Sequence, residues 1–280
     1  MADYTFENCF FDSDLAVERR RADLSCGGIE YREERTVIGK WERIRITSEE
    51  GAKSIGRPKG HYDTLTLPRM DELDFGEIDD AKNELSIELC KLFDIDRIYP
   101  ERILVAGLGN GSLTPDAVGP LAATNVEPTL HISEADEDMF DSLDCSEIAV
   151  IRPGVLGESG IDTGEIIMGV CQRIRPDVVI AIDSLASRSP DRLGTTIQIS
   201  DTGILPGGGI GAKRKPIDEK ALGIPVIAIG VPTVIDSRFF AKNDTRCGSM
   251  FVAPKEIDTI VRKAAEIIGG GINQAFGIYS

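Results

Sequence analysis

The chain has 280 residues and a net charge of −16 at neutral pH, from 47 acidic and 31 basic residues. Such an excess of acid disfavours sequence-independent binding to nucleic acid. The sequence also has no run of about 18 apolar residues that could span a membrane, and its first residues lack a secretory signal pattern. We therefore expect a cytoplasmic protein that binds neither a membrane nor, directly, nucleic acid.

The first part of the chain predicts a small β-rich lobe followed by a long helix. Short alternating strands are indicated at 41–46 and 61–67, with a short helix between them that begins at Thr47 or Ser48. Across 74–95, apolar residues recur at helical spacing and form one stripe. This lobe and its helix are expected to extend from residue 15 to residue 95.

Strands and helices alternate in the remainder of the chain, residues 96–280. Buried strands are expected near Ile103 and at 148–151, 178–182 and 226–230. Residues 195–200 alternate and predict an antiparallel or edge strand, and a closing helix at 254–276 is expected to be interrupted at Gly269-Gly270-Gly271. This order predicts an α/β fold, a mostly parallel sheet with helices on both faces, which forms one compact unit with the N-terminal lobe.

Two aspartates follow two of these apolar strands. Asp116 lies in a Thr114-Pro115-Asp116 sequence after the first strand, where Thr114 is a candidate N-cap and Pro115 a candidate first helical residue. Asp183 comes directly after the run 178–182. If both strands run parallel in one sheet, the two carboxylates emerge at the same edge, where open α/β sheets bind their ligands.

A close pair of carboxyl groups can hydrolyse a peptide bond. Two such groups cannot both ionise easily, so they share a proton and titrate as a pair. One then takes a proton from an attacking water while the other protonates the leaving amine. Asp116, near a helix N-terminus, is the better candidate for the base, which leaves Asp183 as the acid. Each aspartate also has a purely structural explanation, as an acidic residue in a first helical turn or at a strand end.

Two glycine-rich loops suggest nucleotide binding, but neither matches a known pattern. In the loop 107–112 the third glycine comes one position too early for G-x-G-x-x-G, and the loop 207–213 lacks the final glycine of a P-loop and a strand before it. The six cysteines are scattered, with no C-x-x-C pair and no nearby histidine, so a zinc site is not expected.

Several long motifs carry a resemblance to a known family. They are GLGNGSLTPDAVGP at 107–120, PGVLGESGIDTGEII at 153–167, IAIDSLASRS at 180–189, TTIQISDTGI at 195–204, GGGIGAKRK at 207–215 and GIPVIAIGVPTV at 223–234. Together they resemble the germination protease of spore-forming bacteria, an endopeptidase that degrades small acid-soluble spore proteins. The resemblance covers most of residues 14–276.

The resemblance implies an atypical aspartate-dependent endopeptidase with a fold like that of the hydrogenase-maturation proteases, whose two essential aspartates match Asp116 and Asp183. It implies a homotetrameric zymogen in the spore core that removes its own propeptide, with no cofactor. Family members cut after an acidic residue that precedes a large apolar residue and Ala. Here the sequence at 13–16 fits that rule, so Asp14–Leu15 is the expected cleavage site and residues 1–14 are the expected propeptide.

The chain departs from the family in one segment and leaves some questions open. Between Val234 and Met250 this chain has a shorter segment than the family usually carries. The shortening puts in doubt any lid or tetramer contact that the longer segment supplies in the family. The basic run that includes Lys213 and Arg214 is either a solvated turn or a clamp for the acidic residue before the cut bond. The histidine used by metal-handling relatives has no counterpart here, so no metal is expected.

Two other functions stay open at this point. A metal-assisted maturation peptidase would be stimulated by added nickel or zinc. A nucleotide-binding regulatory protein that uses the glycine loops would be stabilised thermally by ATP or NAD.

Overall fold

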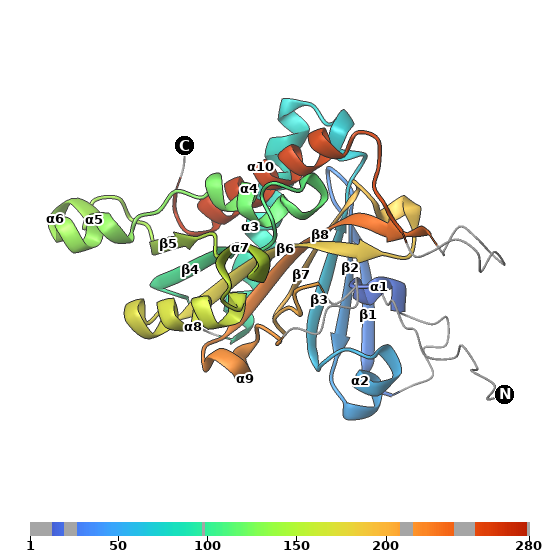
Figure 1. Ribbon diagram of the computed structural model, residues 1–280, viewed down its shortest axis with the longest axis horizontal. Coiled ribbons are helices and arrows are strands. Elements are labelled where there is room, and N and C mark those ends of the chain that lie inside the picture. Colours follow the sequence, from blue (N-terminus) through green and yellow to red (C-terminus); the bar gives the residue numbers. More distant parts are fainter. Residues whose placement is uncertain (1–12, 20–26, 97–98, 208–214, 238–249, 279–280) are drawn as a thin grey trace.

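One large sheet forms the centre of the computed structural model, which describes residues 13–19, 27–96, 99–207, 215–237 and 250–278. Its strands follow the order β1-β2-β3-β7-β8-β6-β4-β5, and β9 pairs with β8 (Figure 1). The strands are β1 (Ile29–Arg35), β2 (Lys40–Ile46), β3 (Gly60–Thr66), β4 (Arg102–Gly107), β5 (Glu147–Ile151), β6 (Val178–Ser187), β7 (Thr196–Ser200), β8 (Val226–Asp236) and β9 (Phe251–Val252).

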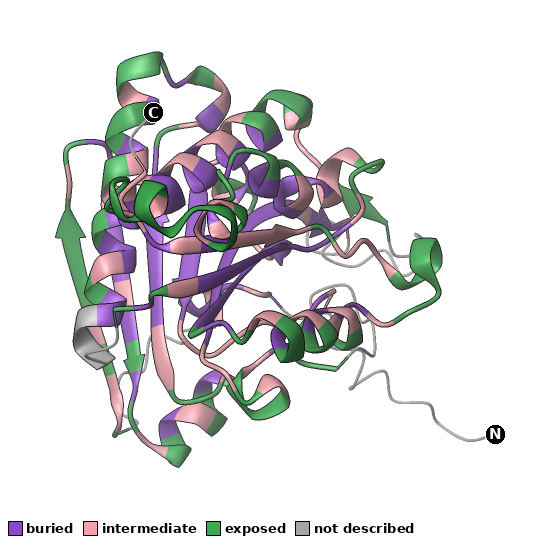
Figure 2. Ribbon diagram, turned by 90° about the vertical axis from the view of Figure 1, so that its left-hand side faces the viewer, coloured by how far each residue is buried: buried purple, intermediate pink, exposed green. Residues whose placement is uncertain are grey.

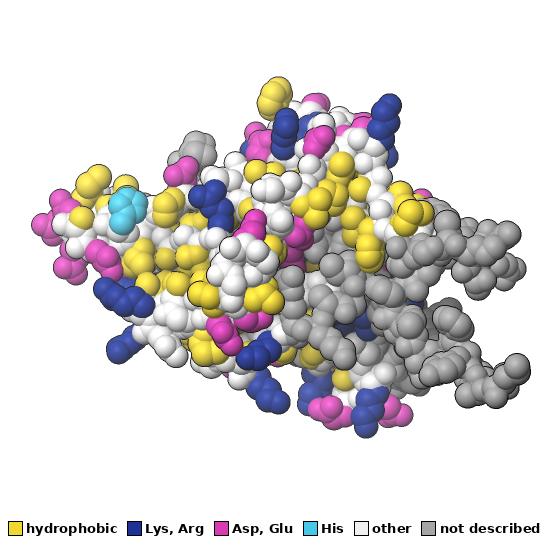
Figure 3. Space-filling model, in the orientation of Figure 1, with side chains coloured by type: hydrophobic (Ala, Val, Ile, Leu, Met, Phe, Trp, Pro, Cys, Tyr) yellow, Lys and Arg dark blue, Asp and Glu magenta, His cyan; other side chains and the backbone are white. Residues whose placement is uncertain are grey.

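Helices pack on both faces of this sheet. They are α1 (Ala16–Arg19), α2 (Glu49–Ile55), α3 (Phe75–Asp96), α4 (Val118–Thr124), α5 (Leu130–Ala135), α6 (Glu137–Asp141), α7 (Leu156–Ser159), α8 (Thr163–Ile174), α9 (Glu219–Leu222) and α10 (Ile257–Ala275). Among the described helices, none is long and apolar enough to cross a membrane. Exposed acidic side chains gather on α5 and α6, which extend to one side of the sheet (Figures 1 and 3).

The predicted α/β fold with helices on both faces is confirmed, and the sheet itself is mixed. Strands β5, β4, β6 and β8 are parallel neighbours, as expected for apolar runs that are buried on both sides. The remaining pairings, β1–β2, β2–β3, β3–β7, β7–β8 and β8–β9, are antiparallel. Parallel pairing therefore holds for the central strands rather than for most of the sheet.

The predicted N-terminal β-rich lobe is an extension of this sheet. Strand β7 lies between β3 and β8, so it is an interior antiparallel strand and not an edge. Through β7, the N-terminal strands β1 to β3 continue the parallel strands without a break. The sequence could not show this, because alternation within one strand does not reveal which strands pair with it.

Two apolar layers bury the two faces of the sheet (Figure 2). On one face, α3, α4 and α10 pack over residues such as Ile180, Ile199 and Ile229. The opposite face carries two separate clusters, one under α8 that includes Ala181 and one at α1 and α2 that includes Tyr62. The part of this face between the two clusters carries the polar groups described below.

The closing helix differs from the expectation at its glycines. Helix α10 runs from Ile257 to Ala275 without the predicted interruption at residues 269–271. A Cβ atom at Gly269 would lie 2.4 Å from Cβ of Asn125, and one at Gly271 would lie 2.8 Å from Cδ2 of Leu85. The glycines thus allow α10 to approach α4 and α3 closely, which outweighs their low helix propensity.

Candidate active site

The two candidate aspartates line one pocket. Asp116 lies in a short 3₁₀ turn, Thr114–Asp116, that follows β4, and Asp183 lies in the neighbouring parallel strand β6. Both contribute to the wall of a pocket of about 200 Å³. The sequence prediction that the two carboxylates converge is therefore confirmed, and their catalytic role stays a prediction.

Asp116 is held by the glycine loop that precedes it. The backbone N–H of Asn110 donates a hydrogen bond to Oδ2 of Asp116 at 2.8 Å. Gly109 has φ of +105°, and a Cβ atom there would lie 2.2 Å from the carbonyl oxygen of Asp116. Only glycine permits both this backbone conformation and this close approach. The loop thus fixes the Asp116 carboxylate in the pocket.

The local structure around Asp116 differs from the expected helix start. Leu113 occupies the cap position of the 3₁₀ turn and makes no side-chain cap, so the predicted N-cap role of Thr114 is wrong. The turn is closed by backbone hydrogen bonds, including one from Asp116 N to the carbonyl of Leu113 at 2.8 Å. The α-helix begins afterwards, at Val118. Asp116 therefore precedes the helix instead of lying in its first turn.

Asp183 is buried, with 4% of its surface exposed. It lies inside β6 and not after its end, because β6 continues beyond it and pairs with β8 as far as Ser187. Its Oδ1 accepts a hydrogen bond from the N–H of Ser184 at 2.9 Å. Since Ala181 of the same strand packs under α8, Asp183 points to that face of the sheet.

The first glycine loop is occupied by structural contacts, which removes the main support for nucleotide binding there. A Cβ atom at Gly107 would lie 2.2 Å from the carbonyl oxygen of Gly119, so this glycine lets α4 pack closely on β4. The Asn110 N–H, which a phosphate could have used, already binds Asp116. In the second loop, residues 208–214, which include Lys213 and Arg214, lie outside the described part of the chain. Lys215 is exposed and pairs with Glu165 at 3.3 Å.

The N-terminal segment 13–19 contributes one residue to the same pocket. Asp14 lines it together with Asp116 and Asp183. The N–H of Asp14 donates to the carbonyl of Ala186 at 2.9 Å, and the N–H of Ala186 donates to Oδ2 of Asp14, also at 2.9 Å. Leu15 is fully buried. The bond that the sequence predicts to be cut, Asp14–Leu15, therefore begins at a residue in the aspartate pocket.

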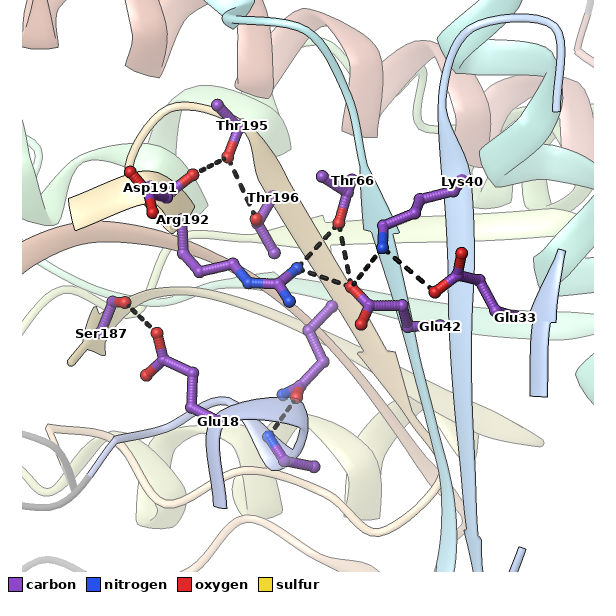
Figure 4. A network of polar contacts seen from close by, with 12 residues as sticks. Glu18, Glu33, Lys40, Glu42, Thr66, Ser187, Asp191, Arg192, Thr195 and Thr196 are labelled. Carbon is purple, nitrogen blue, oxygen red and sulfur yellow. Dashed lines mark hydrogen bonds and ion pairs between the residues drawn. The ribbon is translucent and has the colours of Figure 1, made fainter. Parts of the chain in front are cut away.

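Glu18 of α1 fastens this segment to the end of β6. Its carboxylate accepts hydrogen bonds from the hydroxyl of Ser187 at 2.5 Å and from the N–H groups of Arg188 at 2.7 Å and Ser189 at 3.0 Å. The hydroxyl of Ser13 also donates to it. Figure 4 shows Glu18 and Ser187 pointing toward one another. The segment is thus bound on the C-terminal side of Asp14 as well as at Asp14 itself.

Two residues that the sequence did not indicate also bind the segment. Gln198 of β7 is 8% exposed; its Nε2 donates to the carbonyl of Asp14 at 3.3 Å, and its Oε1 accepts from the N–H of Ala16 at 2.8 Å. Arg57, in the loop after α2, has Nη2 3.7 Å from Oδ1 of Asp14. Alternation with Ile197 and Ile199 could have predicted the face of Gln198, but not its partners.

A second acidic group lies on the opposite face of the sheet, under α3. Burial and the nearby charge of Glu88 raise the pKa of Asp63 to about 7. Burial also acts on Glu88, but the ion pair with Arg43, at 2.7 Å, keeps the pKa of Glu88 below its usual value. A hydrogen bond to Asp201 at 2.6 Å raises the pKa of His61. Among the residues that the structure describes, no three His, Cys, Asp or Glu side chains are placed to hold a metal ion.

Comparison with known proteins identifies the family. The chain matches the family model described as "Germination protease" over residues 12–246. It is 37% identical to the germination protease of Clostridium perfringens over 94% of each chain, and 45% identical to that of Priestia megaterium over 80% of this chain and 63% of the relative. A NiFe hydrogenase maturation protease from Thermococcus kodakarensis superposes with a TM-score of 0.39 at 18% identity, over 66% of this chain and 99% of the other. The chain therefore belongs to the germination protease family of peptidases.

Proposed function

We propose that this protein is an aspartate-dependent endopeptidase, made as a zymogen, that cuts its own Asp14–Leu15 bond and then degrades small acid-soluble spore proteins during germination. The observation that carries the proposal is the position of Asp14, in the pocket that Asp116 and Asp183 also line. An extended segment bound by backbone hydrogen bonds to a strand is a common way of binding a peptide substrate. Asp14 binds Ala186 of β6 in a related way, through one backbone hydrogen bond and one from the N–H of Ala186 to its own carboxylate.

The chemistry needs one water molecule and the two carboxyl groups. In the proposed reaction the pair shares one proton, with Asp116 as the base and Asp183 as the acid. Asp116 takes a proton from water, whose oxygen bonds to the carbonyl carbon of Asp14. The bond from that carbon to the nitrogen of Leu15 then breaks, and the nitrogen receives a proton from Asp183. The products are a carboxylate at Asp14 and an amine at Leu15.

The same position of Asp14 accounts for an inactive zymogen. While Asp14 is bound to Ala186 and Gln198, a second peptide cannot bind to these groups. Cleavage creates a carboxylate and an ammonium group at Asp14 and Leu15, where Leu15 is fully buried. Burial of new charges is costly, so the cut ends are expected to leave the pocket and open it to substrates.

The remaining parts of the proposal follow the family resemblance. Residues 1–14 are the propeptide, and residues 15–95 and 96–280 form one catalytic unit around the shared sheet. The enzyme acts as a homotetramer in the cytoplasm of the spore core, without a cofactor. The shortened segment after Val234 includes residues 238–249, which lie outside the described part of the chain.

A substrate assay tests the proposed function. The processed enzyme is incubated with a purified small acid-soluble spore protein, alongside Asp116→Asn and Asp183→Asn variants. We expect cleavage by the wild type after an acidic residue that precedes a large apolar residue, and loss of at least a thousandfold in rate in each variant. Full activity in either variant would contradict the assignment of that aspartate. Stimulation by added nickel or zinc would favour the metal-assisted alternative instead.

A further inference from the structure

We propose that Arg57 and Gln198 form the substrate-binding site on the acidic side of the cut bond: Arg57 selects the acidic side chain, and Gln198 positions the scissile peptide group. This inference rests on the proposed function, in which Asp14–Leu15 is the bond that the enzyme cuts. The ligand is a peptide with an acidic residue, first from the enzyme's own N-terminus and later from a substrate protein.

The sheet register aligns Gln198 with Asp183. Asp183 pairs with Gly230 in β8, and Gly230 pairs with Gln198 in β7, so the three residues form one row across three adjacent strands. Residues in one row point to the same face of a sheet, and the outer two lie about 10 Å apart. A Cβ atom at Gly230 would lie 2.5 Å from Cδ1 of Leu185, so the Leu185 side chain packs over Gly230 between them. Asp14 lines one pocket with Asp183 and accepts a hydrogen bond from Gln198, so a peptide at its position is within reach of both residues.

Gln198 binds the peptide groups on both sides of Leu15. Its Nε2 donates to the carbonyl oxygen of Asp14 at 3.3 Å, and its Oε1 accepts from the N–H of Ala16 at 2.8 Å. The carbonyl of Asp14 belongs to the bond to be cut, so its oxygen becomes negative when water attacks. An N–H group that already points at this oxygen stabilises that charge. Gln198 therefore touches the reacting carbonyl and also holds the residue after Leu15.

Arg57 accounts for the choice of an acidic residue. Its Nη2 lies 3.7 Å from Oδ1 of Asp14 and donates to the carbonyl of Ser13 at 3.1 Å. The other carboxylate oxygen of Asp14 accepts from the N–H of Ala186. The side chains of Arg57 and Asp14 are 19% and 13% exposed, so their attraction is only partly screened by solvent. A neutral side chain at position 14 would lose both the attraction and one acceptor.

A buried donor on Arg57 supports a binding role. Its Nε is buried and has no hydrogen-bond partner among the described residues. Buried donors without a partner are uncommon and costly in folded proteins. Arg57 also lines a second small cavity together with Asp14, Gln198 and Tyr62. The guanidinium thus retains a donor that a bound acidic side chain of different length could use.

A double-mutant cycle on self-processing tests the role of Arg57. Rates are measured by intact mass for the wild type, Arg57→Gln, Asp14→Asn and the double variant. Each single change is expected to slow the removal of residues 1–14 by about 10- to 100-fold, the value of a hydrogen bond or ion pair that involves a charged group. The double variant should be within about threefold of Arg57→Gln, because the attraction can be lost only once. Arg45→Gln, at an exposed arginine of β2, is the control and should process at the wild-type rate.

Gln198→Ala tests the second half of the inference, with the exposed Gln172→Ala as its control. Loss of a donor to a developing oxyanion slows the chemical step by about 100- to 1,000-fold. Thermal unfolding of every variant shows whether it is folded. Additive effects at positions 14 and 57, or wild-type processing by a folded Gln198→Ala variant, would overturn the corresponding assignment while leaving the proposed function intact. A wild-type chain that is never cut would overturn the proposed function and, with it, this inference.

Discussion

Glu18 provides a direct test of whether docking of the N-terminal segment is needed for processing. Its carboxylate accepts hydrogen bonds from Ser187, Arg188 N and Ser189 N at 2.5 to 3.0 Å. The perturbation is Glu18→Gln, which keeps the shape of the side chain but replaces one acceptor oxygen by an NH₂ group. That group faces N–H donors and cannot bind them.

The size of the effect follows from these contacts. A hydrogen bond to a charged group contributes about 1.5–3 kcal/mol, and the freed N–H groups of the turn can bind water in part. We expect a net loss of about 3 kcal/mol in docking, or a factor of about 150 in the docking equilibrium. Ordering each residue of the segment 13–19 costs about 1–2 kcal/mol, which offsets much of the free energy gained from its contacts. The net free energy of docking is therefore small, and a loss of this size can make docking unfavourable.

The assay is the rate of self-processing, followed by intact mass. Glu18→Gln should process at least tenfold more slowly than the wild type, with unchanged thermal unfolding of the sheet. Ser187→Ala removes one of the hydrogen bonds and should give a smaller effect. Glu50→Gln, at an exposed glutamate of α2, is the control. A folded Glu18→Gln protein that processes at the wild-type rate would refute the idea that the docked segment is the one that is cut.

Two further changes test other parts of the structure. The raised pKa of Asp63, about 7, means that the folded state holds a proton that the unfolded state releases near pH 4. Stability therefore falls as pH rises from about 4 to 7, and Asp63→Asn should be more stable than the wild type at pH 8, by at most about 4 kcal/mol, and similar to it at pH 4 in thermal unfolding. A variant with unchanged pH dependence would contradict the raised pKa. Gly109→Ala, with its Cβ 2.2 Å from the Asp116 carbonyl, should displace Asp116 and reduce substrate cleavage more than 100-fold; near-normal activity would show that the close approach is not required.

The sequence predicted the elements that local pattern determines. Apolar runs placed β4 and β6, helical spacing placed α3, and Ser48 caps α2 as expected, through its hydrogen bond from the N–H of Gly51. The convergence of Asp116 and Asp183 followed from the parallel pairing of those two strands. The predicted elements held because each depends on residues that are close in the chain, whereas the pairing of β4 with β6 joins distant parts of it.

The rest depended on tertiary placement. Gln198 binds Asp14 and Ala16 across more than 180 residues of sequence, and Arg57 reaches Asp14 from a loop that nothing local marks as functional. The predicted break in α10 was wrong because it considered only the low helix propensity of glycine. It did not consider that glycine allows neighbouring helices to pack closely against α10. Contacts like these, and the order of the strands in the sheet, are determined by packing between elements that are distant in the chain. A single sequence does not show which distant elements pack together.

The most direct test of the central claim is the intact mass of the purified chain over hours at mildly acidic pH. We predict that the wild type loses residues 1–14 and leaves a new N-terminus at Leu15, while Asp116→Asn and Asp183→Asn keep their full mass. Cleavage at another bond would contradict the place given to Asp14 in the pocket. Removal of residues 1–14 from either variant at the wild-type rate would contradict the role given to the two aspartates.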